Sequence, residues 1–303
     1  MSFNDSDSWA ILSEIEKSIK SKVDAVGTPL KDWDIQINFG IKTGFNDAFI
    51  IDSQTKEEIL SKCTSEYERV RTTEIIRPIL RGRDIKRYSY QYAGLYLIST
   101  FPAKGYNIDD YPAVKDYLLR FGIERLEQTG KEHIINGERV KSRKKTNNKW
   151  YETQDSISYW DLLSQPKIIW GEISDKSKFC IDLHGRYVPE ATTFMLSGEN
   201  LIYLLAFLNC SVSEYLFSII GTTTGVGTVR WKKYKILELP VPKSIPNDLY
   251  SQLLELCGQI IESSDDDSNE SKINSIIYQV YGLSEDEIGF IESKIYPSKH
   301  SSL

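Results

Sequence analysis

Hydrophobic residues recur with a helical period near the start of the chain and then change to strict alternation. From Ser8 to Ala25 the apolar positions lie three or four residues apart, which is typical of an amphipathic helix. Val26-Gly27-Thr28-Pro29 ends that pattern, and from Trp33 to Phe39 apolar and polar residues alternate, as in a half-buried strand. Ala48 to Ile51 predicts a second strand, so the intervening GIKTGFN is expected to be a turn.

Strand and helix patterns follow one another through the middle of the chain. The expected elements are a short helix over 57–62, a strand over 95–98, a helix over 109–128 with Pro112 in its first turn, strands over 167–173, 179–183 and 192–196, and a long apolar helix over 201–220. Arg139 to Trp150 has no apolar period and is expected to be a loop. The glycine- and threonine-rich stretch from Gly221 to Lys233 is expected to be a second loop.

The last part of the chain has helical patterns only. Helices are expected over 247–261, 272–281 and 284–295, with the acidic stretch SSDDDSNES between the first two and a capping box at the start of the third. The predicted fold class is therefore α+β. We expect a helical lead-in over 1–30, a mixed α/β body over 31–243 and a helical segment over 244–303.

Composition places the chain among ordinary globular proteins. It has 303 residues, of which 40% are hydrophobic and 26% are charged. No apolar run approaches the roughly 20 residues that span a bilayer, and the acidic N-terminus lacks the features of an export signal. The four scattered cysteines indicate reduced thiols, and the three histidines have no ligand-like neighbours. We expect a cytoplasmic protein with no membrane partner and no metal site.

The formal net charge of −6 hides a strong asymmetry along the chain. From Arg71 to Trp150 there are 17 Lys plus Arg against 9 Asp plus Glu, a net charge of +8. From Asp248 to the end there are 11 acidic residues against 3 lysines, a net charge of −8. A basic middle region of this kind indicates an anionic partner, although a solvated charged face is the alternative.

The segment GIKTGFNDAFIID, from Gly40 to Asp52, places Lys42 and Thr43 between two glycines. A phosphate-binding loop of the GxxxxGK[ST] type is excluded, because no Gly-Lys-Ser or Gly-Lys-Thr occurs in the chain. Lys-Thr-Gly also occurs in serine penicillin-recognising enzymes, but every SxxK sequence follows it here instead of preceding it. A contact to a nucleic-acid phosphate and a purely structural strand-turn-strand remain as alternatives.

Three basic segments are candidates for a contact with nucleic acid. IIRPILRGRDIKRY has five basic residues in eleven positions, followed by two tyrosines, although Arg83 and Asp84 could instead form an internal ion pair. Six basic residues lie between Arg139 and Lys149. Arg230-Trp231-Lys232-Lys233 repeats the combination of basic and aromatic residues after the glycine-rich stretch.

Catalytic motifs are missing from the sequence. No Asn-Pro-Pro or Asp-Pro-Pro turn, no glycine-rich dinucleotide fingerprint and no Pro-Asp pair of a metal-dependent nuclease occurs, and Glu292-Ser293-Lys294 lies on a predicted helix. We therefore expect a binding protein. The alternatives are a degenerate metal-dependent nuclease, for which Glu172 is a candidate residue, and a helical protein-interaction module that acts through residues 248–303.

Several long motifs occur together in a characteristic order. These are GIKTGFNDAFIID, IIRPILRGRDIKRY, PKIIWGEIS, the strand with Thr193 and Phe194, ENLIYLLAFLNCSVSEY and ELPVP. In this order they resemble the TaqI-like C-terminal specificity domain, the target-recognition domain of type IIG restriction–modification enzymes and of adenine-specific DNA methyltransferases. The segments WAILSEIEKSIKSKVDAVGTPLKDWDI and IIYQVYGLSEDEIGFIES resemble those that flank the domain, so the resemblance covers nearly the whole chain.

The resemblance implies sequence-specific binding of double-stranded DNA by a domain akin to the specificity subunits of type I systems. Arginine or lysine would read guanine, and asparagine or glutamine would read adenine. The residues expected to contact DNA are Lys42, Thr43, Arg81, Arg83, Lys86, Arg87, Arg143, Lys144, Lys145, Asn147, Asn148, Arg230 and Lys232, of which Arg143, Asn147, Asn148 and Arg230 are the candidates for bases.

The resemblance also implies a division of labour. Related proteins carry a methyltransferase, and often a nuclease, ahead of this domain, so we expect this chain to be a piece of such an enzyme or a separate specificity subunit with a catalytic partner. S-adenosylmethionine and magnesium are expected in those catalytic domains only. No cofactor and no catalytic activity are expected for this chain alone.

Overall fold

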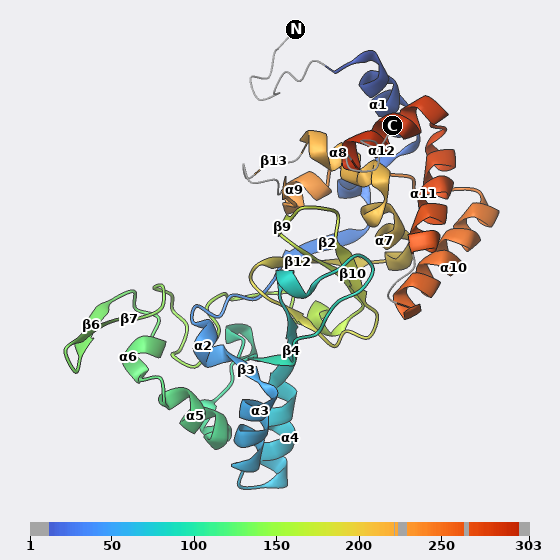
Figure 1. Ribbon diagram of the computed structural model, residues 1–303. Helices are drawn as coiled ribbons and strands as arrows, with labels where there is room; N and C mark the ends of the chain where they lie inside the picture. The colour runs from blue at the N-terminus through green and yellow to red at the C-terminus, as the bar shows by residue number, and fades with distance from the viewer. Residues whose placement is uncertain (1–11, 221, 224–228, 264–266, 297–303) are drawn as a thin grey trace. The chain divides into compact units, whose positions relative to one another are not determined.

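The computed structural model describes residues 12–220, 222–223, 229–263 and 267–296, which form two compact units (Figure 1). We call Asp34–Leu201 together with Thr223–Lys233 the sheet unit. The helical unit comprises the described parts of Met1–Trp33, Ile202–Thr222 and Tyr234–Leu303. The α+β class predicted from the sequence is confirmed, but this division differs from the expected boundaries. The segments 202–222 and 234–243 belong with the terminal helices instead of the α/β body.

The first sheet of the sheet unit is antiparallel throughout, with the strand order β10-β8-β12-β2. Its strands are β2 (Ile35–Phe39), β8 (Lys167–Gly171), β10 (Phe179–Asp182) and β12 (Thr193–Gly198). All five residues of β8 and all four of β10 are buried. Trp170 stacks on Phe194 at 5.4 Å between ring centroids, and this pair forms the centre of an aromatic cluster.

The second sheet has the order β11-β4-β5-β3, with only the β11–β4 pair parallel. Its strands are β3 (Ile50–Asp52), β4 (Ile76–Leu80), β5 (Leu95–Ile98) and β11 (Val188–Pro189). The helices of this part are α2 (Asn46–Phe49), α3 (Ser53–Ser61), α4 (Glu66–Ile75), α5 (Pro112–Leu119) and α6 (Ile123–Leu126). Buried side chains from Ile41 to Met195 form one apolar core here.

Shorter elements complete the sheet unit. A hairpin is formed by β6 (Glu132–Ile135) and β7 (Glu138–Lys141), and β9 (Ile173–Ser174) pairs with β14 (Val229–Arg230). The 3-10 helices of this unit are η2 (Gly82–Asp84), η3 (Pro102–Lys104), η4 (Ile108–Asp110) and η5 (Leu162–Ser164). The two residues Thr222–Thr223 form β13.

The helical unit joins the two ends of the chain. Its helices are α1 (Glu14–Val26), η1 (Leu30–Asp32), α7 (Leu201–Asn209), α8 (Ser211–Ile220), α9 (Lys233–Ile236), α10 (Asn247–Ser263), α11 (Asp267–Tyr281) and α12 (Glu285–Ile295). The strands β1 (Thr28–Pro29) and β15 (Pro240–Val241) pair antiparallel. Glu287 on α12 accepts hydrogen bonds from Ser18 and Lys22 on α1, both at 2.7 Å, and so ties α12 to α1.

The most apolar helices, α7 and α8, are short. Among the described residues no single helix is long and apolar enough to cross a membrane. Leu201–Asn209 and Ser211–Ile219 reach that length and composition only as a pair, and they are bent by 62° between them.

Most of the predicted elements are present. The alternating pattern over 33–39 forms β2, the strand over 95–98 is β5, and the three strand patterns between 167 and 196 form β8, β10 and β12. The predicted capping box is also present, since the Ser284 side chain accepts from the Glu287 amide and Glu287 accepts from the Ser284 amide. Residues 8–11 of the first predicted helix, and 221 and 224–228 of the glycine-rich stretch, lie outside the described residues.

Four predictions of secondary structure are wrong in part. The expected loop over 139–150 begins inside strand β7, and the expected strand over 48–51 is half helix, because α2 continues to Phe49. The single helix expected over 109–128 is interrupted at Gly122, whose φ of +79° ends α5 and starts α6. The long apolar helix over 201–220 is two helices, which break between Asn209 and Ser211.

We predict that Glu287→Gln destabilises the chain most strongly near neutral pH. Burial alone would raise the pKa of Glu287, but hydrogen bonds from Lys22, Ser284 and Ser18 outweigh it and lower the pKa from 4.5 to about 2. Because the pKa is lower in the folded state, the stabilisation is complete above pH 4.5 and is lost as the pH falls toward 2. Urea unfolding should show a loss of about 2 to 3 kcal/mol at pH 7.

The matched control is Glu285→Gln, on the same turn of α12, whose carboxylate is exposed. Its effect should stay within about 0.5 kcal/mol. An equal loss for both variants, or a loss for Glu287→Gln that does not shrink between pH 5 and pH 3, would contradict the proposed role of this carboxylate.

Candidate nucleic-acid interface

Arg143, in the densest basic segment of the sequence, is a buried structural residue of the sheet unit. Its side chain is only 2% exposed. Nε donates to the carbonyl of Leu126 at 2.7 Å, and Nη1 donates to the carbonyls of Thr43 at 2.8 Å and Glu152 at 2.7 Å. Nη2 donates to the carbonyl of Trp150 at 2.6 Å. One guanidinium therefore joins three separate backbone segments through four carbonyls.

The guanidinium of Arg143 interacts with groups inside the protein and not at the surface. Four of the five N–H groups of its guanidinium point at carbonyls, and its charged carbon lies 4.9 Å from the centre of the Phe49 ring. Burial lowers the pKa of Arg143 to about 10, and repulsion from Arg125 adds to this. The group stays charged at neutral pH, but its burial contradicts the prediction that Arg143 contacts DNA bases.

The strand-turn of the GIKTGFN segment is held by similar internal contacts. Thr43 is 1% exposed, and its hydroxyl donates to Asn46 at 2.6 Å and accepts from the amide of Phe45 at 3.1 Å. A Cβ on Gly40 would lie 1.9 Å from the carbonyl oxygen of Glu190, so only glycine fits there. The prediction that Thr43 contacts DNA is therefore wrong, and the structural strand-turn applies to this residue.

Lys42 differs from Thr43, because its side chain is 53% exposed and ends 3.8 Å from a carboxylate oxygen of Asp155. It lines a pocket of about 490 Å³ that also contains Asn147, which is exposed, and Asn148. The Asn148 amide is used internally, since Nδ2 donates to the carbonyls of Thr153 at 3.3 Å and Gln154 at 2.8 Å. Two predicted residues from distant parts of the sequence, Lys42 and Asn147, therefore meet at one pocket with side chains that face solvent.

The basic residues of the IIRPILRGRDIKRY segment are of two kinds. Some form hydrogen bonds with other residues of the chain, and others are exposed. Arg81 holds the buried Asp84 through two side-chain hydrogen bonds of 3.0 and 2.8 Å, and Asp84 in turn accepts from the Arg81 amide. Arg87 donates to the side chain of Ser177 at 2.6 Å and to its carbonyl at 3.1 Å. The internal ion pair suggested by the sequence exists, but Arg81 forms it in place of Arg83.

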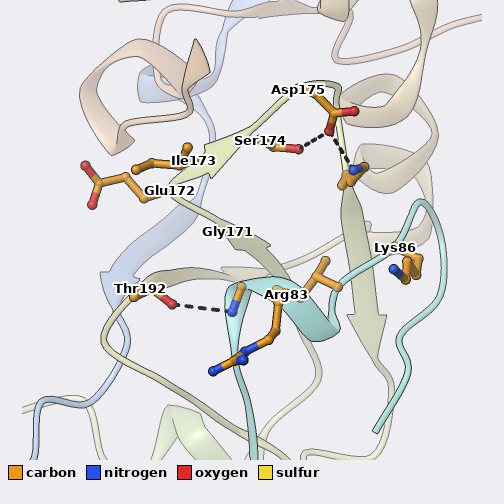
Figure 2. Close-up of a pocket in the computed structure, with 11 residues that line it drawn as sticks. Arg83, Lys86, Gly171, Glu172, Ile173, Ser174, Asp175 and Thr192 are labelled. Carbon is orange, nitrogen blue, oxygen red and sulfur yellow. Dashed lines mark hydrogen bonds and ion pairs between the residues drawn. The ribbon is translucent and has the colours of Figure 1, made fainter. Parts of the chain in front are cut away.

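Arg83 and Lys86 are the residues of the second kind. Both are exposed, and no ion pair or hydrogen bond of either side chain occurs among the described residues. They lie on the wall of a pocket of about 470 Å³, opposite the turn between β8 and β10 that carries Glu172 to Asp175 (Figure 2). We call this the Arg83–Lys86 pocket.

The two carboxylates of the Arg83–Lys86 pocket are already neutralised. Glu172 pairs with Arg230 at 3.1 Å, and Asp175 pairs with Lys178 at 2.6 Å. Figure 2 shows the Glu172 carboxylate directed away from Arg83 and Lys86. The positive charges of Arg83 and Lys86 are therefore left over for a ligand from outside the chain.

The remaining residues predicted to contact DNA differ in exposure and in ion pairing. Lys144 and Lys145 are exposed, and no ion pair of either occurs among the described residues. Arg230 is 42% exposed and is held by Glu172, while Lys232 is half-buried. No group of three or more His, Cys, Asp or Glu that could hold a metal ion occurs in the described part of the chain, and this includes the surroundings of Glu172.

The hairpin of β6 and β7, which brings exposed side chains next to the basic segment, was not predicted from the sequence. The signal was present as Asn136-Gly137, the pair that favours a two-residue turn between antiparallel strands. It was overlooked because the hydrophobic alternation on either side is short and is interrupted by charged residues.

Comparisons with known proteins identify the family and the fold. Residues 77–241 match the family described as the TaqI-like C-terminal specificity domain. No curated protein matches the chain. Among solved structures the chain is similar to the type IIL restriction–modification enzyme MmeI in complex with DNA, with a TM-score of 0.54, 10% identity, and coverage of 89% of this chain and 36% of that chain.

A second solved structure is that of the type IIG restriction endonuclease BpuSI. The TM-score is 0.53 at 11% identity, and the match covers 95% of this chain and 34% of that chain. At these identities the likeness is one of fold. The chain spans about a third of the length of each of these two enzymes.

We predict that Arg143→Ala lowers the free energy of unfolding by at least about 3 kcal/mol, because the substitution leaves several buried carbonyl groups without a donor. Arg143→Lys should recover only part of the loss, since one ammonium cannot reach all four carbonyls on the three segments. Lys144→Ala removes the same charge from the next, exposed position and should change stability by less than about 0.5 kcal/mol. Urea unfolding of the three variants measures these differences, and similar values for positions 143 and 144 would refute the structural role.

Proposed function

Because the chain belongs to the TaqI-like C-terminal specificity domain family, we propose that it binds double-stranded DNA and selects the target sequence of a restriction–modification system. The similarity in fold to MmeI, which was solved in complex with DNA, supports the choice of duplex DNA as ligand. The family supplies the class of function, and the sheet unit supplies the groups that carry it out.

The observation that carries the proposal is the leftover positive charge of the Arg83–Lys86 pocket. Arg83 and Lys86 are exposed cations without an ion-pair partner in the described part of the chain, whereas both carboxylates beside them are paired. A guanidinium and an ammonium at the edge of a concave surface suit two phosphate oxygens of a DNA backbone. Binding there releases condensed counterions, so affinity should fall steeply as salt rises.

The internally bonded residues of the same segment support this assignment. Arg81 fixes the turn through Asp84, and Arg87 fixes the next stretch through Ser177. Arg81 therefore holds the backbone before Arg83, and Arg87 holds the backbone after Lys86. A rigid backbone presents these two side chains in one place, and less entropy is lost when the phosphate binds.

Contacts that position the protein must be distinguished from contacts that read sequence. Lys42, Lys144 and Lys145 are exposed and can neutralise further phosphates. Asn147 carries an exposed amide, the group that forms two hydrogen bonds with adenine in the major groove. Arg230 and Lys232 contribute from the segment after β14, where Glu172 holds the Arg230 guanidinium.

A catalytic partner completes the activity. The two similar enzymes are about three times as long as this chain, so the chain acts beside a methyltransferase or nuclease, either as a domain of the same protein or as a separate subunit. That partner binds S-adenosylmethionine and magnesium and carries out the chemistry in the cytoplasm. This chain supplies the choice of site and has no catalytic activity of its own.

We predict that the double variant Arg83→Ala/Lys86→Ala binds a fluorescently labelled DNA duplex of mixed sequence at least about ten-fold more weakly than the wild type. The slope of log affinity against log salt should fall by about 2, one for each phosphate that the variant no longer neutralises. Fluorescence anisotropy over a series of salt concentrations measures both quantities.

The matched control is Lys62→Ala/Lys115→Ala, which removes two charges from exposed ion pairs of α3 and α5. Its net charge equals that of the test variant, so a general electrostatic effect would weaken both variants equally. Equal salt slopes for the two double variants would reject the Arg83–Lys86 pocket as a phosphate site. Wild-type binding that does not change with salt would reject DNA binding itself.

A further inference from the structure

We propose that the β6–β7 hairpin enters the major groove of the target DNA, with Arg139 and Ile134 as residues that determine specificity. This inference rests on the proposed DNA-binding function and assigns a particular groove and particular side chains to it. Four independent features of the hairpin support it: its form, the exposure of one face, its charge and its anchoring.

The hairpin is short, regular and separate from the two larger sheets. Ile134 pairs with Arg139 and Ile135 pairs with Glu138 across a two-residue turn. The turn residues Asn136 and Gly137 have φ of +52° and +85°, as a tight turn with positive φ at both central positions requires. Figure 1 shows the hairpin as a ribbon beyond α6, standing away from the other strands of the sheet unit.

One face of the ribbon points entirely to solvent. Cross-strand partners share a face, so Ile134 and Arg139 lie side by side, next to the pair of Glu132 and Lys141, and all four are exposed. Ile134 is 78% exposed, the largest fraction among the large apolar side chains that the structure describes. The opposite face, with His133 and its partners, is more buried. An isoleucine in this position adds nothing to the core, so its apolar surface is available to a partner.

The charge of the ribbon and its base matches a polyanion. Between residues 131 and 145 the exposed charged side chains are those of Lys131, Glu132, Glu138, Arg139, Lys141, Lys144 and Lys145. Five cations and two carboxylates give a surplus of three positive charges. None of the five cations forms an ion pair within the described part of the chain. The surplus favours a polyanion such as DNA over a basic or apolar protein partner.

The ribbon is firmly fixed at its base. The amide of Gly130 donates to the carbonyl of Arg143 at 2.9 Å, and the amide of Ser142 donates to the carbonyl of Lys131 at 2.9 Å. The Arg143 amide bonds the carbonyl of Glu127, and its guanidinium binds the carbonyls described above. The buried Arg143 therefore holds the two strands of the hairpin at their base. The hairpin is fixed in position before it meets the DNA.

The dimensions and chemistry select the major groove. A two-stranded ribbon fits into that groove, which is about 12 Å wide, but not into the minor groove, which is about 6 Å wide. Arginine donates two hydrogen bonds to O6 and N7 of guanine, and an apolar side chain packs on the methyl group of thymine. Arg139 next to Ile134 therefore suits neighbouring guanine and thymine bases.

The test compares the full chain with Arg139→Ala and Ile134→Ala in a selection of bound duplexes from a randomised library. The wild type should enrich one motif, and Arg139→Ala should lose the preference for a guanine in it by about ten-fold or more while the other positions are retained. Ile134→Ala should reduce the preference for thymine at a neighbouring position of the motif. Arg120→Ala, which removes an exposed arginine directly after α5, is the control and should enrich the wild-type motif.

Replacement of the selected guanine by 7-deazaguanine isolates the groove. This base lacks the N7 acceptor of the major groove, keeps O6 and is unchanged in the minor groove, so the advantage of the wild type over Arg139→Ala should shrink on the modified duplex. Both residues are exposed, so their replacement leaves the fold intact, and thermal unfolding of each variant checks this.

The outcomes distinguish the two levels of inference. If the wild type enriches a motif and both hairpin variants enrich the same one, the hairpin does not read bases, although the DNA-binding function stands. An undiminished advantage of the wild type on the 7-deazaguanine duplex would show that Arg139 does not contact N7 in the major groove and would overturn the inference as well. If the wild type binds no duplex at all, the proposed function fails and the hairpin inference fails with it.

Discussion

The buried guanidinium of Arg143 is the constraint on which the arrangement of the sheet unit's basic segments depends. A charge removed from water is tolerated only when hydrogen bonds replace its hydration, and here four carbonyls from three chain segments provide that replacement. None of these segments alone can satisfy the guanidinium. The strand-turn at Thr43, the end of α6 and the stretch around Trp150 must therefore come together before the charge can be buried. Since the backbone of Arg143 also holds the base of the β6–β7 hairpin, the position of the hairpin follows from the same contact.

Other charged residues of the sheet unit also form internal ion pairs. These residues belong to the framework of the unit, in contrast to the cations that are exposed at its surface. Lys167 and Asp182 form an ion pair of 2.7 Å between β8 and β10, with side chains that are 0% and 3% exposed. Arg81 and Asp84 fix the turn that precedes Lys86. Charges used in this way are held by partners inside the chain. The cations that remain exposed and without an ion pair among the described residues, such as Arg83, are consequently the candidates for a contact with a ligand, and structure is needed to tell the two kinds apart.

This distinction explains how much could be predicted from the sequence. The strands β2, β5, β8, β10 and β12 were predictable because local periodicity reports which face of a strand is buried. The basic segments were predictable as candidates because composition alone reveals a local surplus of charge. The burial of Arg143 was not, because its partners lie up to 100 residues away and are backbone carbonyls, which leave no mark on the sequence. The break of the apolar run at Asn209 was equally hidden, since both halves keep a helical pattern.

A net charge of −6 does not conflict with a DNA-binding role for this chain. Electrostatic interactions between exposed charges are largely screened beyond about 8 to 10 Å at physiological salt. A phosphate at the Arg83–Lys86 pocket therefore responds to the charges nearest to it, where the carboxylates of Glu172 and Asp175 are already paired with cations. The −8 carried between Asp248 and the end of the chain belongs to the helical unit and not to the sheet unit that carries this pocket. The relevant quantity for binding is thus the local balance of unpaired charge, which is positive both at this pocket and along the β6–β7 hairpin.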